Sequence, residues 1–322
     1  MTAFPVDRHG LIRRPTALAF DISDDELCAA VRRGALLRLT PGVYVPNSKA
    51  FDDAKGREEL FRLQSIAVAT SCADHALPLS HTSAAAVHRL LTLSPDHRRV
   101  HVTTTDGRGG GIRSNRHVHQ STLRDDEVVS VDGVAVTSLA RTAVDVATMG
   151  SFAQALTVFD STLRRGADRD TMHDSLTGPR RGVRPARRAI DLADGESESV
   201  GESWSRAQIL TAGLPRPRVQ QWVRGISGRE YRCDFGLGPR LVAEFDGKIK
   251  YGRLLRPGED IADVILREKA REDDIRAAGY MMLRWTWGTL RDGSLLGILN
   301  PWRSHMHQPT PVSSTQHQPK LG

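Results

Sequence analysis

Three carboxylates stand close together in the last third of the chain, and their residue types suit a divalent-cation site. Asp234 lies in one short segment that mixes apolar and charged residues, and Glu244 and Asp246 lie in the next. Gly238 and Pro239 separate the two segments, a pattern that predicts two strands joined by a tight turn. Because alternate side chains of a strand share a face, Glu244 and Asp246 are expected about 7 Å apart on one side of the sheet, with Asp234 on the partner strand.

Carboxylate oxygens are the ligands that Mg²⁺ or Mn²⁺ prefers, and such an ion polarises a phosphate and activates water. Asp234 and Glu244 are therefore predicted as metal ligands, and Asp246 as a third ligand or as the residue that orients the water. Lys248 and Lys250 follow in the same segment, and either ammonium would stabilise the negative charge that develops on a phosphate. The alternative is that these charges form the solvent-facing side of a half-buried sheet.

The elements that must position these residues flank them on both sides. Residues 198–210 predict a helix in which Glu202 and Arg206 share one face, because they are four positions apart. Glu202 is expected to act as an outer metal ligand or as the partner of Arg206. Residues 261–278 predict a charged amphipathic helix, and an apolar strand follows over residues 280–285.

Several short motifs lie in this part of the chain. They are Glu202-x-x-x-Arg206, Ala212-Gly213-Leu214-Pro215, Asp234, Glu244-Phe245-Asp246-Gly247 and Gly279-Tyr280-x-x-Leu283-Arg284. Together with the order of elements, they resemble the restriction-endonuclease-like fold and the small family related to very-short-patch-repair endonucleases. The resemblance implies a magnesium-dependent DNA endonuclease. Asp246 departs from the acid-x-lysine pattern of restriction-type sites, and Lys250 stands where the family usually has histidine, so cleavage stays open.

The composition of the chain limits the number of domains and the class of partner. The chain has 322 residues and a formal net charge of +7, which predicts two or three domains and a polyanionic partner. An arginine-rich, lysine-poor composition also arises from a GC-rich genome. Cys28, Cys72 and Cys233 lack the spacing of a disulfide framework or a zinc site. The absence of a basic-then-apolar leader and of a long apolar run predicts a soluble, cytoplasmic protein without a membrane partner.

The first fifty residues predict a winged helix-turn-helix. Ser23 followed by Glu26 is a capping box that opens a helix through Arg33, and residues 36–45 predict a hairpin with its turn at Pro41. Such a module places its second helix in the major groove of double-stranded DNA and its wing on the phosphates. The candidate phosphate contacts are Arg32, Arg33 and Arg38. The alternative is a winged helix that docks a protein.

The middle region, from about residue 58 to residue 176, predicts an α+β domain. Expected elements are helices over 59–72 and 80–88, strands over 100–104 and 116–119, and a helix capped by Thr137 or Ser138 in which Arg141 pairs with Asp145. His81 has the residue type of a catalytic base, and Ser80 or Ser83 that of its nucleophile. No glycine elbow or third partner accompanies them, so a protein partner or a homodimer is the preferred interpretation.

Two regions resemble AbiEi-type antitoxins. In the first fifty residues the matching positions are Arg33-Gly34, Leu36, Arg38, Gly42, Val43 and Tyr44. In the middle region the matching strings are Ser80-His81-x-Ser83-Ala84-Ala85 and Thr137-Ser138-x-x-Arg141-Thr142-x-x-Asp145. The resemblance implies a regulator or antitoxin that binds DNA and docks a cognate toxin protein.

The predicted fold class is therefore α/β (α+β), in five segments. Arg180 and Arg181 belong to an arginine-rich stretch broken by proline and glycine, which predicts either a linker that screens phosphate or a solvated turn. The segments are a winged helix-turn-helix over 1–50, a central AbiEi-like domain over 51–177, the linker over 178–195, a restriction-endonuclease-like domain over 196–302 and a disordered tail over 303–322.

Three functions are compatible with these patterns. The first is a DNA-binding regulator or antitoxin whose nuclease-like domain serves binding alone. The second is a magnesium-dependent endonuclease steered by the winged helix, and the third is a protein-interaction adaptor. The acidic cluster favours the endonuclease, whereas the imperfect lysine placement favours the regulator.

Overall fold

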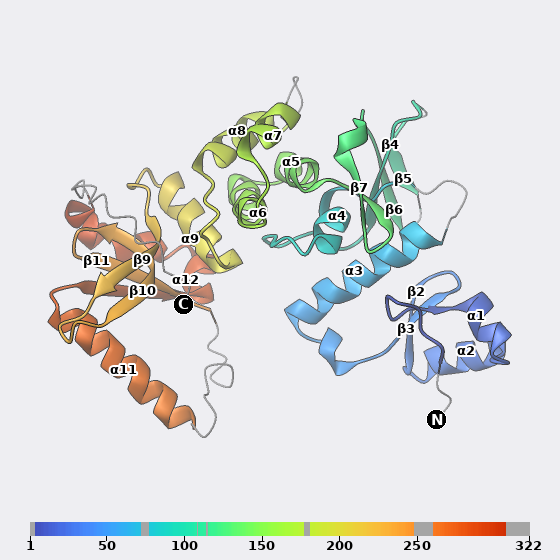
Figure 1. Cartoon of the computed structure of the whole chain (residues 1–322), viewed down its shortest axis with the longest axis horizontal. Helices are drawn as coiled ribbons and strands as arrows, with labels where there is room; N and C mark the ends of the chain where they lie inside the picture. Colours follow the sequence, from blue (N-terminus) through green and yellow to red (C-terminus); the bar gives the residue numbers. More distant parts are fainter. Residues whose placement is uncertain are drawn as a thin grey trace, which may run out of the picture. The chain divides into compact units, whose positions relative to one another are not determined.

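The computed structural model describes residues 4–71, 77–107, 109–113, 115–176, 181–247 and 260–306. The chain is a mixed α/β protein that divides into two compact units, Met1–Gly195 and Glu196–Gly322 (Figure 1). Each unit has its own hydrophobic core, and each is described by itself. Every helix in the described ranges is too short or too polar to span a membrane.

The first fifty residues contain the expected pair of helices and the expected hairpin. The elements are β1 (Ile12–Arg13), α1 (Arg14–Ala19), α2 (Asp24–Arg32), β2 (Leu36–Thr40) and β3 (Val43–Pro46), and the strands pair in the order β1-β3-β2. The predicted capping box is confirmed: Ser23 Oγ accepts a hydrogen bond from the Glu26 backbone N–H at 3.2 Å, and the Glu26 carboxylate accepts one from the Ser23 N–H at 2.8 Å. The sequence does not predict β1, which pairs with β3 and directly precedes α1.

The rest of this unit combines short sheets with helices. Its elements are α3 (Ala54–Thr70), α4 (His81–Val87), β4 (Val100–Thr104), β5 (Gly111–Arg113), β6 (Arg116–Gln120), β7 (Val128–Val131), β8 (Val134–Thr137), α5 (Leu139–Met149), α6 (Phe152–Arg164) and α7 (Arg169–Ser175). The strands predicted over 100–104 and 116–119 are confirmed as β4 and β6, which pair in parallel. The helix cap at Ser138 is also confirmed, because its hydroxyl accepts from the Arg141 N–H at 3.4 Å.

The alternation of residues along β4 and β6 divides their side chains between two faces of the sheet. The residues that pack into or against the main core are Val100, Val102 and Val118. Since alternate side chains of a strand point to opposite sides, the residues between these valines share the other face. The parallel register pairs His101 with His117 and Thr103 with His119, so three histidines meet on that face.

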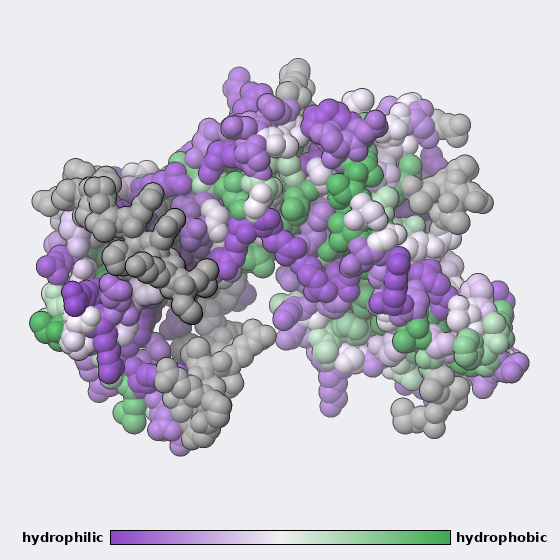
Figure 2. Space-filling model, viewed as in Figure 1, coloured by the Kyte–Doolittle hydropathy of each residue, from purple (hydrophilic) through white to green (hydrophobic). Residues whose placement is uncertain are grey.

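Residues 178–195 are predicted as a linker, and the structure corrects that prediction. Val183–Leu192 forms helix α8, which packs against α6. Its buried side chains are Val183, Ala186, Ala189 and Ile190. Pro185 lies in the first turn, where a proline interrupts no helical hydrogen bond. The solvent side of α8 is hydrophilic (Figure 2); Arg181 is exposed just before it, and Arg180 lies outside the described residues.

The C-terminal unit contains the predicted order of helix, three strands, helix and strand. Its elements are α9 (Val200–Thr211), β9 (Arg218–Arg224), β10 (Glu230–Gly238), β11 (Leu241–Asp246), α11 (Ile261–Ala277), β12 (Met281–Thr286), α12 (Trp287–Asp292), α13 (Leu295–Leu299) and a 3₁₀ helix, η4 (Asn300–His305). The strand order is β12-β11-β10-β9, with β11 parallel to β12 and the other neighbours antiparallel. Residues 303–305 belong to η4 instead of the predicted disordered tail, because Trp302 and Met306 pack against the core; residues 307–322 lie outside the described ranges.

Helices cover both faces of this sheet (Figure 1). On one face α9, α12 and α13 surround a core that includes Phe235 and Trp285. On the other face α11 contributes Ile275 to a core that includes Val242. Since side chains alternate along β11, Glu244 shares the face of Val242 and is directed toward α11.

Candidate functional site

Gly201 allows α9 to pack closely against the end of β11. A Cβ atom on Gly201 would lie 1.9 Å from the Phe245 ring, so a larger residue cannot occupy this position without displacing the ring. The helix is also tied to β12, because the Trp285 indole N–H donates a hydrogen bond to Ser205 Oγ at 2.8 Å. These contacts bring Glu202, which follows the glycine, to the region where β11 ends and its pairing with β10 stops.

Glu202 is buried and well supplied with hydrogen-bond donors. Its carboxylate accepts from the Glu198 backbone N–H at 2.9 Å, from the Ser199 hydroxyl at 2.7 Å and from the Gln220 amide at 2.9 Å. Burial nevertheless raises the pKa of Glu202, and the charge of Glu198 adds to the effect. Glu202 therefore lies at the predicted site, on the same helix as the fully buried Arg206.

Asp234 takes the place of a backbone partner at the point where strand pairing stops. The register of β10 and β11 runs through the pair Phe235 and Ala243. Beyond this pair the Asp234 carboxylate accepts a hydrogen bond from the Phe245 N–H at 2.8 Å. Burial, followed by the negative charge of Glu202 and a smaller effect of Glu244, raises the pKa of Asp234 to about 7.

Two arginines form ion pairs with the Glu244 carboxylate. One Glu244 oxygen lies 2.6 Å from an Arg271 nitrogen, and the other lies 3.3 Å from an Arg284 nitrogen. The Arg284 side chain also pairs with Glu272 at 3.1 Å. The predicted metal ligand is thus part of an ion-pair network between β11, β12 and α11.

In the carboxylate site, Glu244 is ion-paired with two arginines. The other acids of the site have raised pKa values; these are Glu202, Asp234 and Asp246. Burial raises the pKa of Asp246, and the charge of Glu244 acts in the same direction. A carboxyl with a pKa near 7 exchanges its proton close to neutral pH, and a divalent cation can replace that proton. Lys248 and Lys250 lie outside the described residues, so their role in stabilising charge on a phosphate stays a prediction.

The predicted DNA-contacting arginines of the first fifty residues lie around the end of α2 and on β2. Arg32, Arg33 and Arg38 are all exposed, and none forms an ion pair with a residue that the structure describes. Two acids of α2 have partners within the protein. Asp24 binds Arg14 at 2.7 and 2.5 Å, and Glu26 closes the capping box.

The pair predicted between Arg141 and Asp145 is confirmed and belongs to a larger buried group. Arg141 Nε lies 2.9 Å from the Asp145 carboxylate, and another guanidinium nitrogen lies 3.0 Å from Glu127. The same guanidinium donates to the Thr122 carbonyl at 2.9 Å. All three charged side chains are buried, so this arginine serves two acids.

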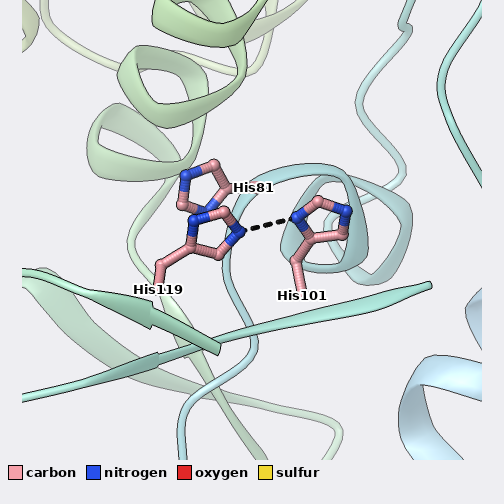
Figure 3. Close-up of side chains that lie close together, drawn as sticks. All are labelled: His81, His101 and His119. Atoms are coloured by element: carbon pink, nitrogen blue, oxygen red, sulfur yellow. Dashed lines mark hydrogen bonds between the residues drawn. The ribbon is translucent and has the colours of Figure 1, made fainter. Parts of the chain in front are cut away.

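Sequence reasoning missed a histidine cluster in the N-terminal unit. His81, His101 and His119 have ligand atoms that all lie within 4.8 Å of one another, a spacing that no other group of three or more His, Cys, Asp or Glu in the described ranges reaches. The cluster joins α4 to β4 and β6 (Figure 3). The alternation His117-Val118-His119 was the available signal, because it places two imidazoles on one face of a strand.

Two curated proteins of Mycobacterium tuberculosis are similar to this chain. They are "Uncharacterized protein MT2308" of strain CDC 1551 / Oshkosh and "Uncharacterized protein Rv2248" of strain ATCC 25618 / H37Rv. Each is 30% identical over 165 residues, which cover 46% of this chain and 61% of the relative. The chain therefore spans about three fifths of the length of the curated relatives that it matches. No protein-family model matches the chain.

Proposed function

We propose that this chain is a DNA-binding protein of the regulator or antitoxin type, in which the first fifty residues act as a winged helix-turn-helix. The observation that carries the proposal is the group of exposed guanidiniums formed by Arg32, Arg33 and Arg38. In winged-helix modules the second helix enters the major groove and the wing contacts phosphates. The end of α2 and strand β2 are the corresponding positions here. A toxin protein as a second partner follows from the resemblance to AbiEi-type antitoxins.

The charges around these arginines favour an anionic ligand. Asp24 is held by Arg14 in a two-point ion pair, and Glu26 caps its own helix. These acids therefore repel a phosphate less than free carboxylates would. The exposed arginines on α8 add positive charge to the same unit, and charge of this kind produces the salt-dependent part of DNA affinity.

The test is a titration of duplex DNA with the full chain at several salt concentrations. Replacement of Arg32, Arg33 and Arg38 by alanine should weaken binding and reduce the slope of log affinity against log salt by about three units, one for each phosphate contact. Arg98→Ala is the matched control, because Arg98 is exposed but already paired with Asp96 at 2.6 Å. An unchanged slope in the triple variant would contradict the proposal.

A second function, magnesium-dependent cleavage of DNA, is favoured by one specific observation. Asp234, Glu202 and Glu244 come from three elements, and the charges of Glu202 and Glu244 both add to the effect of burial in raising the pKa of Asp234, which is the electrostatic setting in which a cation binds favourably. Asp234 and Glu244 would hold the ion, and the ion would activate water at a phosphodiester. The arginine partners of Glu244 must then exchange with the cation.

Thermal unfolding and nicking assays test this second function together. Mg²⁺ or Mn²⁺ should raise the melting temperature of the wild type but not that of Asp234→Asn. Nicking of supercoiled DNA should require the metal and disappear in Asp234→Asn. Glu268→Gln serves as the control, since Glu268 pairs with Arg271 at 3.5 Å without belonging to the carboxylate group. Nicking that persists in Asp234→Asn would assign the activity to another site or another protein.

A further inference from the structure

We propose that His81, His101 and His119 form a transition-metal site that binds Zn²⁺. The site lies in the N-terminal unit and uses none of the residues of the carboxylate site. All three ligand nitrogens lie within 4.8 Å of one another, and Figure 3 shows the three rings gathered between α4 and the two strands. The cluster requires no residue outside the described ranges.

The fold builds this cluster from sheet register. His101 of β4 and His119 of β6 share the sheet face opposite the valine core, as the parallel pairing of these strands dictates. His81 enters from the start of α4 and stacks on His119 with ring centroids 3.7 Å apart. Since residues from three elements meet, ordinary amphipathic packing of one element does not account for the arrangement.

One distance within the cluster is already close to that of a zinc site. Zinc–nitrogen bonds of about 2.1 Å in a tetrahedral site separate two ligand nitrogens by about 3.3 Å. His101 Nδ1 and His119 Nε2 are 2.8 Å apart and share a hydrogen bond. Binding of an ion to both nitrogens would shift the hydrogen of this bond to the other nitrogen of its own ring, and would move the two ligand nitrogens apart by about 0.5 Å, which side-chain rotation supplies.

The three rings are buried against one another. Burial, reinforced by neighbouring histidines, lowers the pKa of His101 to about 4 and that of His119 to about 3. Burial also holds the pKa of His81 well below its usual value.

Two serine hydroxyls form hydrogen bonds with the proposed ligand residues, as the groups around the ligands of a metal site commonly do. Ser80 Oγ lies 2.9 Å from His81 Nδ1, which leaves Nε2 for an ion, and Ser83 Oγ accepts from the His101 backbone N–H at 2.8 Å.

His81 has a φ of 49°, a left-handed conformation that non-glycine residues adopt at an energetic cost. Thr103 Oγ1, next but one to His101 on the same strand face, is buried without a hydrogen-bond partner among the described residues. Such strain and an unsatisfied hydroxyl are expected beside a site that a ligand completes.

The ligand set selects the class of ion. Three neutral imidazoles without a carboxylate suit Zn²⁺ and related transition metals, whereas Mg²⁺ and Ca²⁺ prefer oxygen ligands. Three protein ligands leave a fourth position for water or an exogenous group, which is the arrangement of open zinc sites. The ligand His119 and the neighbouring His117 are both half-buried.

The experiment measures metal binding by the full chain without an affinity tag. Zn²⁺ is titrated in competition with a chromophoric chelator, and Co²⁺ is used as a spectroscopic probe of tetrahedral coordination. The wild type should bind one ion per chain with a tetrahedral Co²⁺ spectrum. His119→Phe keeps an aromatic ring in the stack but removes the nitrogen, and should weaken binding more than about 100-fold.

Three further variants make the result specific. His117→Phe is the matched control, because His117 stacks on His119 at 4.0 Å but is outside the ligand group; its binding should stay within a few-fold of wild type. His81→Asn should lose binding while tolerating the left-handed backbone. A double variant, His307→Ala with His317→Ala, tests two further histidines of the sequence that are not proposed as ligands, and it should retain the stoichiometry. Absence of tight binding in the folded wild type, or equal losses in His117→Phe and His119→Phe, would overturn the proposal.

Discussion

In the C-terminal unit, Glu202, Asp234 and Glu244 converge from α9, β10 and β11, whereas in the N-terminal unit three histidines converge from α4, β4 and β6. Both groups bring hydrophilic side chains into the protein interior. The carboxylates meet beside arginines and backbone N–H groups. The imidazoles meet beside hydroxyls and each other.

The difference shows two ways to bury titratable groups. A carboxylate is charged at neutral pH, so it must either have a counter-charge, as Glu244 does, or take up a proton, as the raised pKa of Asp234 indicates. An imidazole becomes neutral at neutral pH when burial lowers its pKa, and it can then stack on other rings. We therefore expect hard cations at the first group and softer transition metals at the second.

The largest effect is expected where a buried counter-charge is removed. Arg141 neutralises Glu127 and Asp145 in the N-terminal unit, as Arg271 and Arg284 neutralise Glu244 in the other. Arg141→Leu removes the guanidinium that pairs with two buried carboxylates and should lower the free energy of unfolding of this unit by about 3–5 kcal/mol. Urea unfolding measures the change. Arg98→Ala, which loses an exposed pair with Asp96, should change stability far less than Arg141→Leu; equal losses would refute the distinction between buried and exposed pairs.

A smaller effect, with a defined pH dependence, is expected at Asp234. Its pKa is raised from 3.8 to about 7 in the folded chain, so the folded state holds a proton that the unfolded state has lost between these values. The free energy of unfolding should therefore fall as the pH rises from about 4 to about 7. Without added metal, the wild type should lose about 2 kcal/mol more than Asp234→Asn between about pH 5 and pH 8. Parallel curves for the two proteins would show that this acid is not held protonated.

The contact that positions the carboxylates should give a change of similar or lesser size. Gly201→Ala forces a methyl group into the Phe245 ring and should destabilise the C-terminal unit by about 1–3 kcal/mol through overpacking. Gly297→Ala is the control, because a Cβ atom there meets nothing within 4 Å and alanine favours a helix. Thermal unfolding distinguishes them. A neutral Gly201→Ala would mean that α9 does not depend on this close approach.

Local patterns predicted much of the fold. The capping box at Ser23, the cap at Ser138 and the alternating strands at 100–104 and 116–119 depend on residues close in sequence. The pairing of Arg141 with Asp145 follows from helical spacing alone. The linker predicted over 178–195 was wrong where α8 forms, because the packing of its apolar face against α6 outweighs the proline and glycine signals.

The sequence by itself determined which residues could act: a group of acids near the end of the chain, a set of arginines in the first fifty residues, and histidines spaced two apart at His117 and His119. Only the tertiary structure decided which of them meet. It directed Arg271 and Arg284 onto Glu244, and it joined His81 to histidines about twenty and forty positions away. The physical reason is that secondary structure depends on neighbours along the chain. The pKa of a group and its capacity to bind a metal depend instead on burial and on charges that strand register and helix packing bring near.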